Sequence, residues 1–396
     1  TIITGSTATV EAGNGYWINT TSNTCTITLP SSAESGDQIV LIDYARTWGT
    51  NSIFIDSNGL NYQGNNDTYT VEYTTDGQSL NIVYSDATKG WIPLEDDVVA
   101  EAPVAPPTQK ALFGFGSVSY PNGLSMTNLV SSSGVVATDT TGVGSGKYGS
   151  AACGYGGDKA IFGYGLITGN TYSSLSNLVS NSGVVASNTT GVGSARGFLA
   201  ATSYGGDKGM FGYGDTGSDV SLTNLVNNSG VIATDTTGVG TARRLLAAAS
   251  YGGDKAIFGY GYTSTNLSMS NLVSSSGVVA SDVTGVGTAR GYLAAAGYGG
   301  DKAIFGYGYN GSNLSMTNLV SNIGVVGSDV SGVGTARRMT AAASYGGDKA
   351  IFGYGFTSGV DSITNLVNNS GVVAADVTGV GTARDQLAAA GYSTSA

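Results

Sequence analysis

The sequence of 396 residues contains no histidine, two cysteines and six prolines, and only 11% of its residues are charged. Without histidine it can form neither a Ser-His-Asp triad nor a histidine-ligated zinc site, and it has no histidine general base. Cys25 and Cys153 lie in different segments, so we expect no framework disulfide. No apolar run approaches the length of a membrane span, so we expect no membrane insertion.

The first part of the chain has many acidic residues and few basic ones. Residues 1–107 carry 13 acidic and 2 basic residues, whereas residues 108–396 carry 14 of each. The net charge of −11 therefore lies entirely in the first part of the chain. Binding to a phosphate backbone needs a basic patch. We expect no nucleic-acid partner.

Glycine is abundant, with 63 residues, and one glycine-rich phrase recurs along the chain. The phrase "SYGGDKAIFGYG" at residues 344–355 has close copies upstream, and the first phenylalanine of successive copies is spaced by 49, 49, 47, 47 and 47 residues. Such a period is typical of a solenoid, a propeller or another repeat array. These phenylalanines are Phe113, Phe162, Phe211, Phe258, Phe305 and Phe352.

The sequence divides into three segments. Residues 1–97 do not repeat, and their short alternating runs, such as "QIVLIDY" and "LNIVYS", predict a small β domain. Residues 98–108 hold half of the prolines and predict a stiff linker. Residues 109–396 form six copies of one unit of about 47 residues.

Each repeat contains four strand-like runs, which matches one blade of a β-propeller. In the repeat that begins at Lys255 they are "KAIFGYG", "SMSNLVS", "GVVASDV" and "YLAAAGY". The Gly-Gly-Asp sequence after the Ala-rich run predicts a hairpin turn, and the glycines of "FGYG" would let neighbouring sheets approach closely. The sequence therefore predicts an all-β protein whose second part is a six-bladed propeller.

The ends of the repeat array favour a closed ring. The first copy begins at Gln109 and lacks the Ala-rich strand that should precede it, whereas the last copy ends with "QLAAAGY". The final strand can therefore complete the first blade, while an open solenoid would carry capping repeats. The alternative is a trimer whose repeats run along a shared axis as a fibre shaft.

The repeat resembles a kelch-type blade in the order of its Arg-to-aliphatic strand, glycine turn and glycine-containing apolar strand. It departs from that pattern because Gly-Tyr-Gly replaces the double glycine and the late tryptophan is missing from all six copies. The resemblance covers residues 109–396 and implies a kelch-like propeller.

A closer resemblance is to virion proteins of tailed bacteriophages, in particular marine phages that infect cyanobacteria. "NLVSNSGVVAS", "TTGVGTAR" and "YGGDKAIFGYG" are similar to repeats of tail-associated proteins. "SGDQIVLIDYARTWGTNSIFIDSNG" and "LNIVYSDATKGW" are similar to a small β domain of tail fibres and tail needles. The resemblance implies a location on the virion, attachment to other virion proteins through residues 1–97, and a homotrimer.

Two sets of charged residues recur in the repeats, one acidic and one basic, and both are candidate sites. Acids repeated in nearly every copy are more plausibly structural than catalytic, because a reaction centre needs one asymmetric set of groups. The acids are Asp139, Asp235, Asp282, Asp329 and Asp376, with Asn188 in the second copy, and Asp158, Asp207, Asp254, Asp301 and Asp348. A cation before each Ala-rich strand could line the mouth of the axial channel, or could pair with the Asp eight residues earlier or cap a neighbouring blade. The cations are Lys147, Arg196, Arg243, Arg290, Arg337 and Arg384.

The copies differ from one another at two places, which we expect to share one face of the disc. One is the loop after "FGYG". The other is the pair after the cation, namely Tyr148-Gly149, Gly197-Phe198, Arg244-Leu245, Gly291-Tyr292, Arg338-Met339 and Asp385-Gln386. Aromatic faces beside amide and carboxylate acceptors suit sugar rings. The candidate ligand-binding residues are Tyr120, Tyr172, Asp215, Asp219, Tyr262, Tyr309, Asn310, Phe356 and Asp361.

We therefore expect a non-catalytic structural protein of a tailed-phage virion, such as a tail fibre or receptor-binding component, that presents one propeller face to host glycans or neighbouring virion proteins. We expect no catalytic residue, no metal and no cofactor. Alternatives are a capsid decoration or fibre-shaft protein, a secreted bacterial lectin or adhesin, and a glycan hydrolase or lyase.

Overall fold

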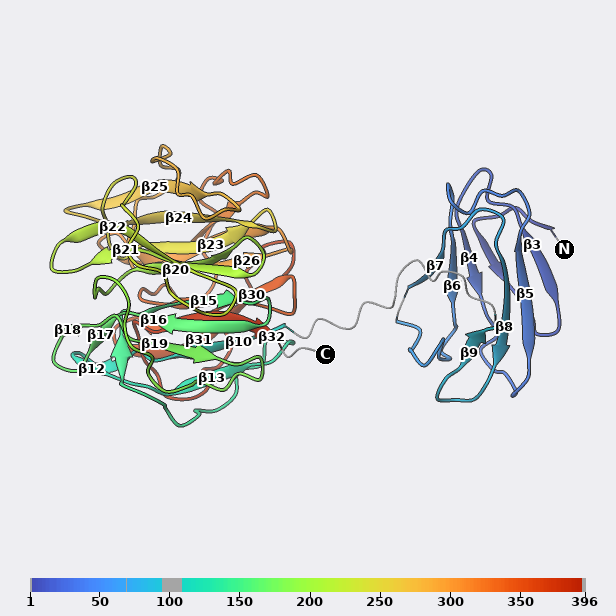
Figure 1. Ribbon diagram of the computed structural model, residues 1–396, viewed down its shortest axis with the longest axis horizontal. Helices are drawn as coiled ribbons and strands as arrows, with labels where there is room; N and C mark the ends of the chain where they lie inside the picture. The colour runs from blue at the N-terminus through green and yellow to red at the C-terminus, as the bar shows by residue number, and fades with distance from the viewer. Residues whose placement is uncertain (1, 69, 95–108, 394–396) are drawn as a thin grey trace. The chain divides into compact units, whose positions relative to one another are not determined.

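The computed structural model describes residues 2–68, 70–94 and 109–393, and every regular element within them is a β-strand. The all-β prediction is confirmed at this level. No helix of this part of the chain is long and apolar enough to cross a membrane. The chain divides into two compact units, an N-terminal unit within residues 1–106 and a repeat unit within residues 107–396 (Figure 1). The predicted linker at residues 98–108 lies outside the described residues.

The N-terminal unit contains two sheets (Figure 1). The first has the order β1-β3-β5-β8-β9, and the second has the order β2-β4-β6-β7. Strands β1, β3 and β5 are parallel, as are β2, β4 and β6. Their bounds are β1 Ile2–Ile3, β2 Thr7–Thr9, β3 Gly15–Ile18, β4 Cys25–Thr28, β5 Gln38–Asp43, β6 Ile53–Asp56, β7 Val71–Tyr73, β8 Ser79–Tyr84 and β9 Trp91–Pro93.

One hydrophobic core holds these two sheets together. Alternate residues of β5 are buried, as period-2 alternation requires, and Ile39 and Leu41 point into a core that also contains Trp48 and Trp91. Cys25 belongs to this core, and both Cys25 and Cys153 are buried and free.

Among the described residues of the repeat unit, six three-stranded antiparallel sheets share one arrangement of strands, and they are numbered here from sheet 1 to sheet 6. In each of the six, a central strand with the sequence "KAIFG" or a close variant of it lies between an Ala-rich strand and a strand that contains "NLV". The Ala-rich strands are β32 Ala388–Ser393 in sheet 1, then β15 Ala151–Tyr155, β20 Ala200–Tyr204, β23 Ala247–Tyr251, β26 Ala294–Tyr298 and β29 Ala341–Tyr345. The central strands are β10 Gln109–Gly114, β16 Lys159–Gly163, β21 Lys208–Asp215, β24 Lys255–Tyr262, β27 Lys302–Tyr309 and β30 Lys349–Phe356.

The third strands complete these sheets, and shorter strands lie beside the first two repeats. The third strands are β13 Thr127–Val130, β19 Ser176–Val179, β22 Asp219–Val226, β25 Asn266–Val273, β28 Asn313–Val320 and β31 Val360–Val367. The shorter strands are β11 Ser117–Ser119, β12 Asn122–Gly123, β14 Lys147–Tyr148, β17 Leu166–Ile167 and β18 Thr171–Tyr172.

The prediction of a fourth strand at "GVVASDV" is wrong. In the fourth repeat this segment makes only two isolated bridges, Ser270↔Val283 and Val273↔Val279. Between the two bridges the side chain of Asn271 donates to the carbonyl of Ala280, at 3.0 Å. A side chain therefore takes the place of backbone partners and interrupts the ladder.

The last strand of the repeat unit completes its first sheet. Strand β32 pairs antiparallel with β10, from Gln109↔Ser393 to Gly114↔Ala388, as predicted from the ends of the array. The Ala-rich strands also follow one another in space, in the order β15, β20, β23, β26, β29 and β32, and β32 contacts β15. The six-bladed propeller itself remains a prediction.

The aromatic-glycine phrase explains how successive sheets pack. A Cβ built on Gly163 of sheet 2 would lie 2.7 Å from Cζ of Phe211 in sheet 3, so only glycine admits the ring. Phe211 also meets Tyr164 edge-on, with ring centroids 5.1 Å apart. The glycine of the same phrase is overlaid by the next sheet's phenylalanine in all six repeats. The expected close approach of neighbouring sheets is confirmed.

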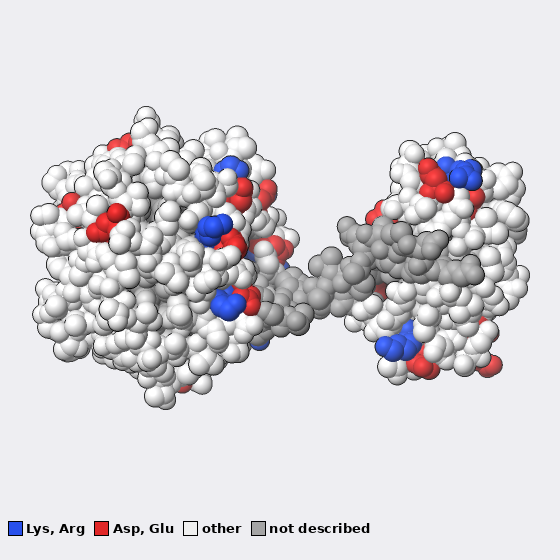
Figure 2. All heavy atoms as spheres, in the orientation of Figure 1, with Lys and Arg blue, Asp and Glu red and all other residues white. Residues whose placement is uncertain are grey.

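The Gly-Gly-Asp turns are hairpin turns, as predicted. Between β15 and β16, Gly156 and Gly157 have φ of 63° and 78°, a region that glycine enters at little cost. In five repeats the Asp of the turn forms an ion pair with the Lys that follows it, at 2.6 to 3.0 Å. Figure 2 shows basic and acidic side chains next to one another on the surface of the repeat unit, most of which is uncharged.

Candidate functional site

The segments that vary between repeats lie together on one face of the repeat unit. Backbone bridges join the residue after each buried cation to the end of the next central strand, as in Gly197↔Asp215, Arg244↔Tyr262 and Arg338↔Phe356. The two variable segments are therefore adjacent in the structure. We call this surface, made by the loops between the second and third strands and by the pairs after the cations, the variable face.

Several predicted ligand-binding residues contact neighbouring side chains on the variable face. Tyr120 is 60% exposed and its ring meets that of Tyr148 at 5.6 Å. Arg244 pairs with Asp219 at 2.7 Å and with Asp215 at 3.8 Å, so each of these acids has a charged partner. None of the predicted ligand-binding residues lines the cavities that we describe among residues 109–393.

A second group on this face surrounds Arg338. Its guanidinium carbon lies 4.7 Å from the centroids of both Tyr309 and Phe356, and its Nη1 donates to Asn313 at 3.2 Å. Aromatic rings on either side of a guanidinium hold it by cation–π attraction. This arrangement fixes the side chain.

The other predicted residues on the variable face are less closely engaged. The carboxylate of Asp361 accepts hydrogen bonds from the backbone N–H groups of Ser362 and Ile363, so it stabilises the local backbone. Asn310 is exposed, Tyr172 and Tyr262 are half-buried, and Arg244 lies 5.5 Å from the ring of Tyr262.

Six residues near the middle of the variable face close a ring of backbone hydrogen bonds. In each, the N–H donates to the carbonyl of its counterpart in the preceding repeat, at 2.8 to 3.2 Å, and the first repeat donates to the sixth. All six have φ between 52° and 58°, a region that side chains other than glycine rarely adopt. We call this ring the axial collar; its members are Gly149, Phe198, Leu245, Tyr292, Met339 and Gln386.

A cavity of about 80 Å³ lies within the collar. The residue after each collar member also lines it, and together these form a second ring. Four of its members are leucine and two are polar: Ser150, Leu199, Leu246, Leu293, Thr340 and Leu387. The alanines of the Ala-rich strands line a further cavity that shares members of this second ring.

The two polar members of the second ring are buried without hydrogen-bond partners for their hydroxyl groups. Ser150 and Thr340 are 8% and 7% exposed, and their hydroxyl groups have no hydrogen-bond partner among the described residues. Oε1 of Gln386 in the collar is also buried without a partner in this part of the chain. A buried polar atom without a partner costs about 1–3 kcal/mol, so three on one cavity require an explanation.

Asp385 lies beside the collar and is also largely buried. Burial raises the pKa of its carboxyl group to about 6, although a hydrogen bond from Gln386 and the charge of Arg338 lower it. Since a carboxylate accepts, the amide nitrogen of Gln386 is the donor to Asp385, and Oε1 of Gln386 has no partner among the described residues. Sequence analysis did not identify the collar, its orphan polar atoms or Asp385 as members of a site.

The predicted channel-mouth cations are not at the mouth of a channel, and that prediction is wrong. Each side chain is 0% exposed and lies between two sheets, where backbone and amide oxygens replace water. The residues corrected here are Lys147, Arg196, Arg243, Arg290, Arg337 and Arg384.

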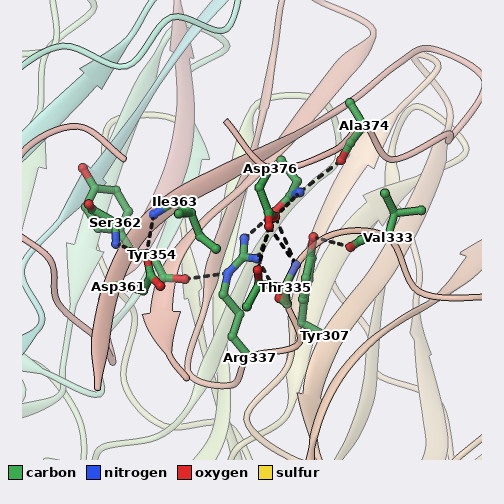
Figure 3. Close-up of polar contacts among 11 residues, drawn as sticks. Tyr307, Val333, Thr335, Arg337, Tyr354, Asp361, Ser362, Ile363, Ala374 and Asp376 are labelled. Carbon is green, nitrogen blue, oxygen red and sulfur yellow. Dashed lines mark hydrogen bonds and ion pairs between the residues drawn. The ribbon is translucent and has the colours of Figure 1, made fainter. Parts of the chain in front are cut away.

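Arg337 illustrates this junction between sheets (Figure 3). Its guanidinium stacks at 4.2 Å on Tyr307 of sheet 5 and donates to the carbonyl of Tyr354 and to Oδ1 of Asn365, both in sheet 6, at 2.9 and 2.7 Å. The nearest carboxylate is Asp376 of the next repeat, at 3.9 Å. The expected pairing with the Asp eight residues earlier is therefore wrong, whereas bridging to a neighbouring sheet is confirmed.

The recurring acid of each junction is structural. Burial alone would raise the pKa of Asp376, but hydrogen bonds from Thr335 and Asn365 outweigh it and lower the pKa. The same pattern holds for Asp139, Asp235, Asp282 and Asp329.

Sequence analysis also missed the buried asparagine that links each Arg to its acid. It is 0% exposed in all six repeats, and its invariance inside an apolar strand was the available signal. These residues are Asn128, Asn177, Asn224, Asn271, Asn318 and Asn365.

The junction between sheets 1 and 2 differs from the other five in three residues at once. Lys147 replaces Arg, Asn188 replaces Asp, and Phe115 replaces Tyr. Lys147 Nζ donates to Asn177 at 2.7 Å and lies 4.8 Å from the ring centroid of Phe115. Burial lowers the pKa of Lys147 to about 7, because no carboxylate among the described residues pairs with it.

The N-terminal unit has an apolar surface outside its core. Ile2 pairs with Trp17 across β1 and β3, and these side chains are 50% and 45% exposed. Tyr44 is 52% exposed and meets Trp17 edge-on at 6.5 Å. Half-buried Ile42 extends this surface along β5. We call these four residues the apolar face of the N-terminal unit.

The chain matches no protein-family model, and no curated protein is significantly similar to it.

Proposed function

We propose that residues 109–396 form a six-bladed, kelch-like β-propeller. Pairing of β10 with β32 in one chain, and the cyclic order of backbone hydrogen bonds in the axial collar, support a closed ring. A trimeric fibre shaft would have no reason to pair the first and last strands of one chain. In this proposal each blade has three laddered strands, with the bridged "GVVASDV" segment in the place of the fourth.

We propose that the protein is a non-catalytic structural component of a tailed-phage virion, and that its variable face contacts the host surface. One observation carries this proposal: the repeats differ on the variable face and agree in five of the six junctions and in the Gly-Gly-Asp hairpin turns. Loops carried by a rigid scaffold are a common place for recognition. The resemblance of the repeats to tail-associated proteins supports the virion location.

The N-terminal unit would attach the propeller to other virion proteins or to further copies of itself. The apolar face, with Trp17 at its centre, is the surface that supports this role. Exposed apolar patches commonly mark interaction sites. A homotrimer would present three variable faces at once, and linked weak sites gain about 10²- to 10⁴-fold in avidity.

The experiment is immunogold labelling of phage particles with antibody fragments raised against residues 109–396, followed by an adsorption assay. We expect labelling of the tail and slower adsorption to the host. Labelling of the head alone would favour a capsid decoration protein. A protein found free in the medium and never on particles would favour a secreted lectin or adhesin.

The attachment role has its own test, the mass of the protein in solution. We expect the wild type to be trimeric and Trp17→Ser to be monomeric. Phe54→Ser provides the matched control, because Phe54 is a half-buried aromatic residue on β6 of the other sheet. A monomeric wild type, or an unchanged mass of Trp17→Ser, would contradict the role. Degradation of host polysaccharide by the purified protein would revive the enzyme alternative.

A further inference from the structure

We infer that the cavity within the axial collar binds the end of a neutral sugar chain through its hydroxyl groups. This inference rests on the proposed function, and it names the ligand class and the part of the variable face that binds it.

The first argument is the composition of the second ring. Leucine occupies four of its six positions, so the fold accepts an apolar side chain there. Ser150 and Thr340, on either side of Leu387, are the exceptions, and both are more than nine-tenths buried. Packing favours leucine at these positions, and replacing an unpartnered polar group by an apolar one is stabilising. The hydroxyl groups therefore have a role other than packing.

The second argument is that the three polar atoms without partners belong to residues of one cavity. The hydroxyl groups of Ser150 and Thr340 and Oε1 of Gln386 belong to residues that line the same cavity. The cavity of about 80 Å³ is well above the ~10–15 Å³ that one water needs. It can admit a larger polar group.

The opposite wall of the cavity is apolar. Phe198, Leu245 and Tyr292 of the collar, with Leu246 and Leu293 below them, form this wall. One polar side and one apolar side containing two aromatic rings suit a sugar, which has hydroxyl edges and a C–H face. Serine and threonine hydroxyls can both donate and accept, as sugar hydroxyls do.

The lining of the cavity favours a neutral ligand. None of the described residues that line the cavity is charged, although the charges of Arg244 and Arg338 reach Tyr292 of the collar. The carboxylate of Asp385 accepts a hydrogen bond from the side chain of Gln386, and Oε1 of Gln386 is an acceptor without a partner among the described residues. An acceptor there binds a sugar O–H and repels a carboxylate.

The test is saturation-transfer NMR on the whole chain with methyl glycosides of glucose, galactose, mannose and N-acetylglucosamine. We expect transfer to at least one glycoside in the wild type and at least a tenfold weaker effect in Ser150→Leu/Thr340→Leu. This variant installs the residue found in the other four repeats, so its thermal unfolding should be unchanged or shifted upwards.

The matched control is Ser250→Gly. Ser250 lines a separate cavity together with Gln109, Gly253 and Ser344, and Gly297 holds the equivalent position in the next repeat. This variant should keep the transfer. No transfer to any glycoside in the wild type, equal transfer in the double-leucine variant, or loss of transfer in Ser250→Gly would each overturn the inference.

Binding of the same proteins to host cells separates this inference from the proposed function. Equal binding by the wild type and the double-leucine variant would overturn the inference and leave the proposed function standing. Glycoside transfer without any binding to host cells would instead contradict the proposed function.

Discussion

The ring of Phe113 packs against Gly353, where a Cβ added to the glycine would lie 2.7 Å from Cζ of the phenylalanine. This contact joins sheet 1 to sheet 6 and repeats the packing found at the other five junctions. Gly353→Ala should therefore destabilise the protein by about 1–3 kcal/mol through overpacking. Urea unfolding measures this change.

Gly327→Ala is the control for this substitution, because all five other repeats have alanine at that position. Its Cβ would meet only the carbonyl of Leu319, at 3.4 Å. We expect it to stabilise the protein by about 0.4–1 kcal/mol, since alanine restricts the unfolded chain. Equal effects of the two substitutions would contradict the packing described for Gly353.

Adjacent arginines should differ greatly in their contribution to stability. Arg337→Ala leaves Asp376 and Asn365 without their partner inside a junction, and should cost about 3–5 kcal/mol. Arg338→Ala removes a half-exposed side chain on the variable face, and should cost about 1 kcal/mol or less. Chemical denaturation of both variants gives the comparison, and similar losses would show that the junction is not the main role of Arg337.

Lys147 should make stability depend on pH above neutrality. The folded state releases its proton near pH 7, whereas the unfolded state keeps it to about pH 10.5, so the unfolded state binds more protons between these values. Stability should therefore rise with pH across this window, by at most about 1.4 kcal/mol per pH unit.

Lys147→Arg/Asn188→Asp installs the pair found at the other junctions and should remove this dependence. Urea unfolding at pH 7 and pH 9 should show the wild type gaining on this variant as pH rises. Parallel pH profiles would mean that Lys147 stays protonated in the folded protein.

Asp385 should have the opposite effect at lower pH. Its raised pKa of about 6 means that the folded state binds more protons than the unfolded state from about pH 4 to pH 6. The contribution of Asp385 to stability should fall as pH rises through this window and stay level above it. Asp385→Asn should therefore be more favourable, relative to the wild type, at pH 7 than at pH 4, as urea unfolding at both pH values can show. A constant difference between the two proteins at pH 4 and pH 7 would contradict this role of Asp385.

The sequence was sufficient for features that depend on chain order and backbone demands. The missing Ala-rich strand before Gln109 predicted the pairing of β10 with β32, and the double glycines predicted the hairpin turns. Both follow from local rules: an unpaired strand needs a partner, and a tight turn needs glycine.

The direction of the buried cations could not be predicted in the same way. Spacing placed Asp329 near Arg337, eight residues apart, but the guanidinium turns towards Asp376, 39 residues later, because that acid is held beside sheet 6 by Asn365 of β31. Only the packing of successive sheets determines this choice. An Asn conserved among the repeats was the one signal that a polar bridge crosses each junction.

The axial collar was hidden for a different reason. Its conformation is held by backbone hydrogen bonds, so residues as unlike as Gly149, Tyr292 and Gln386 occupy equivalent positions. Their variability indicated a surface, and gave no sign of the ring beneath. The polar atoms of Ser150 and Thr340 gain meaning only when the cavity is known.

The pairing of β10 with β32 also governs how the protein is made. The side chain of Arg384 donates to the carbonyl of Phe115, and these residues are 269 positions apart in the sequence. The first sheet therefore stays incomplete until nearly the whole repeat unit has been synthesised. At about 5–20 residues per second this delay lasts from about fifteen seconds to a minute. A product released early would carry the open edge of β10, and an open edge invites pairing with other chains. The closing strand therefore distinguishes chains that contain β32 from chains that end before it.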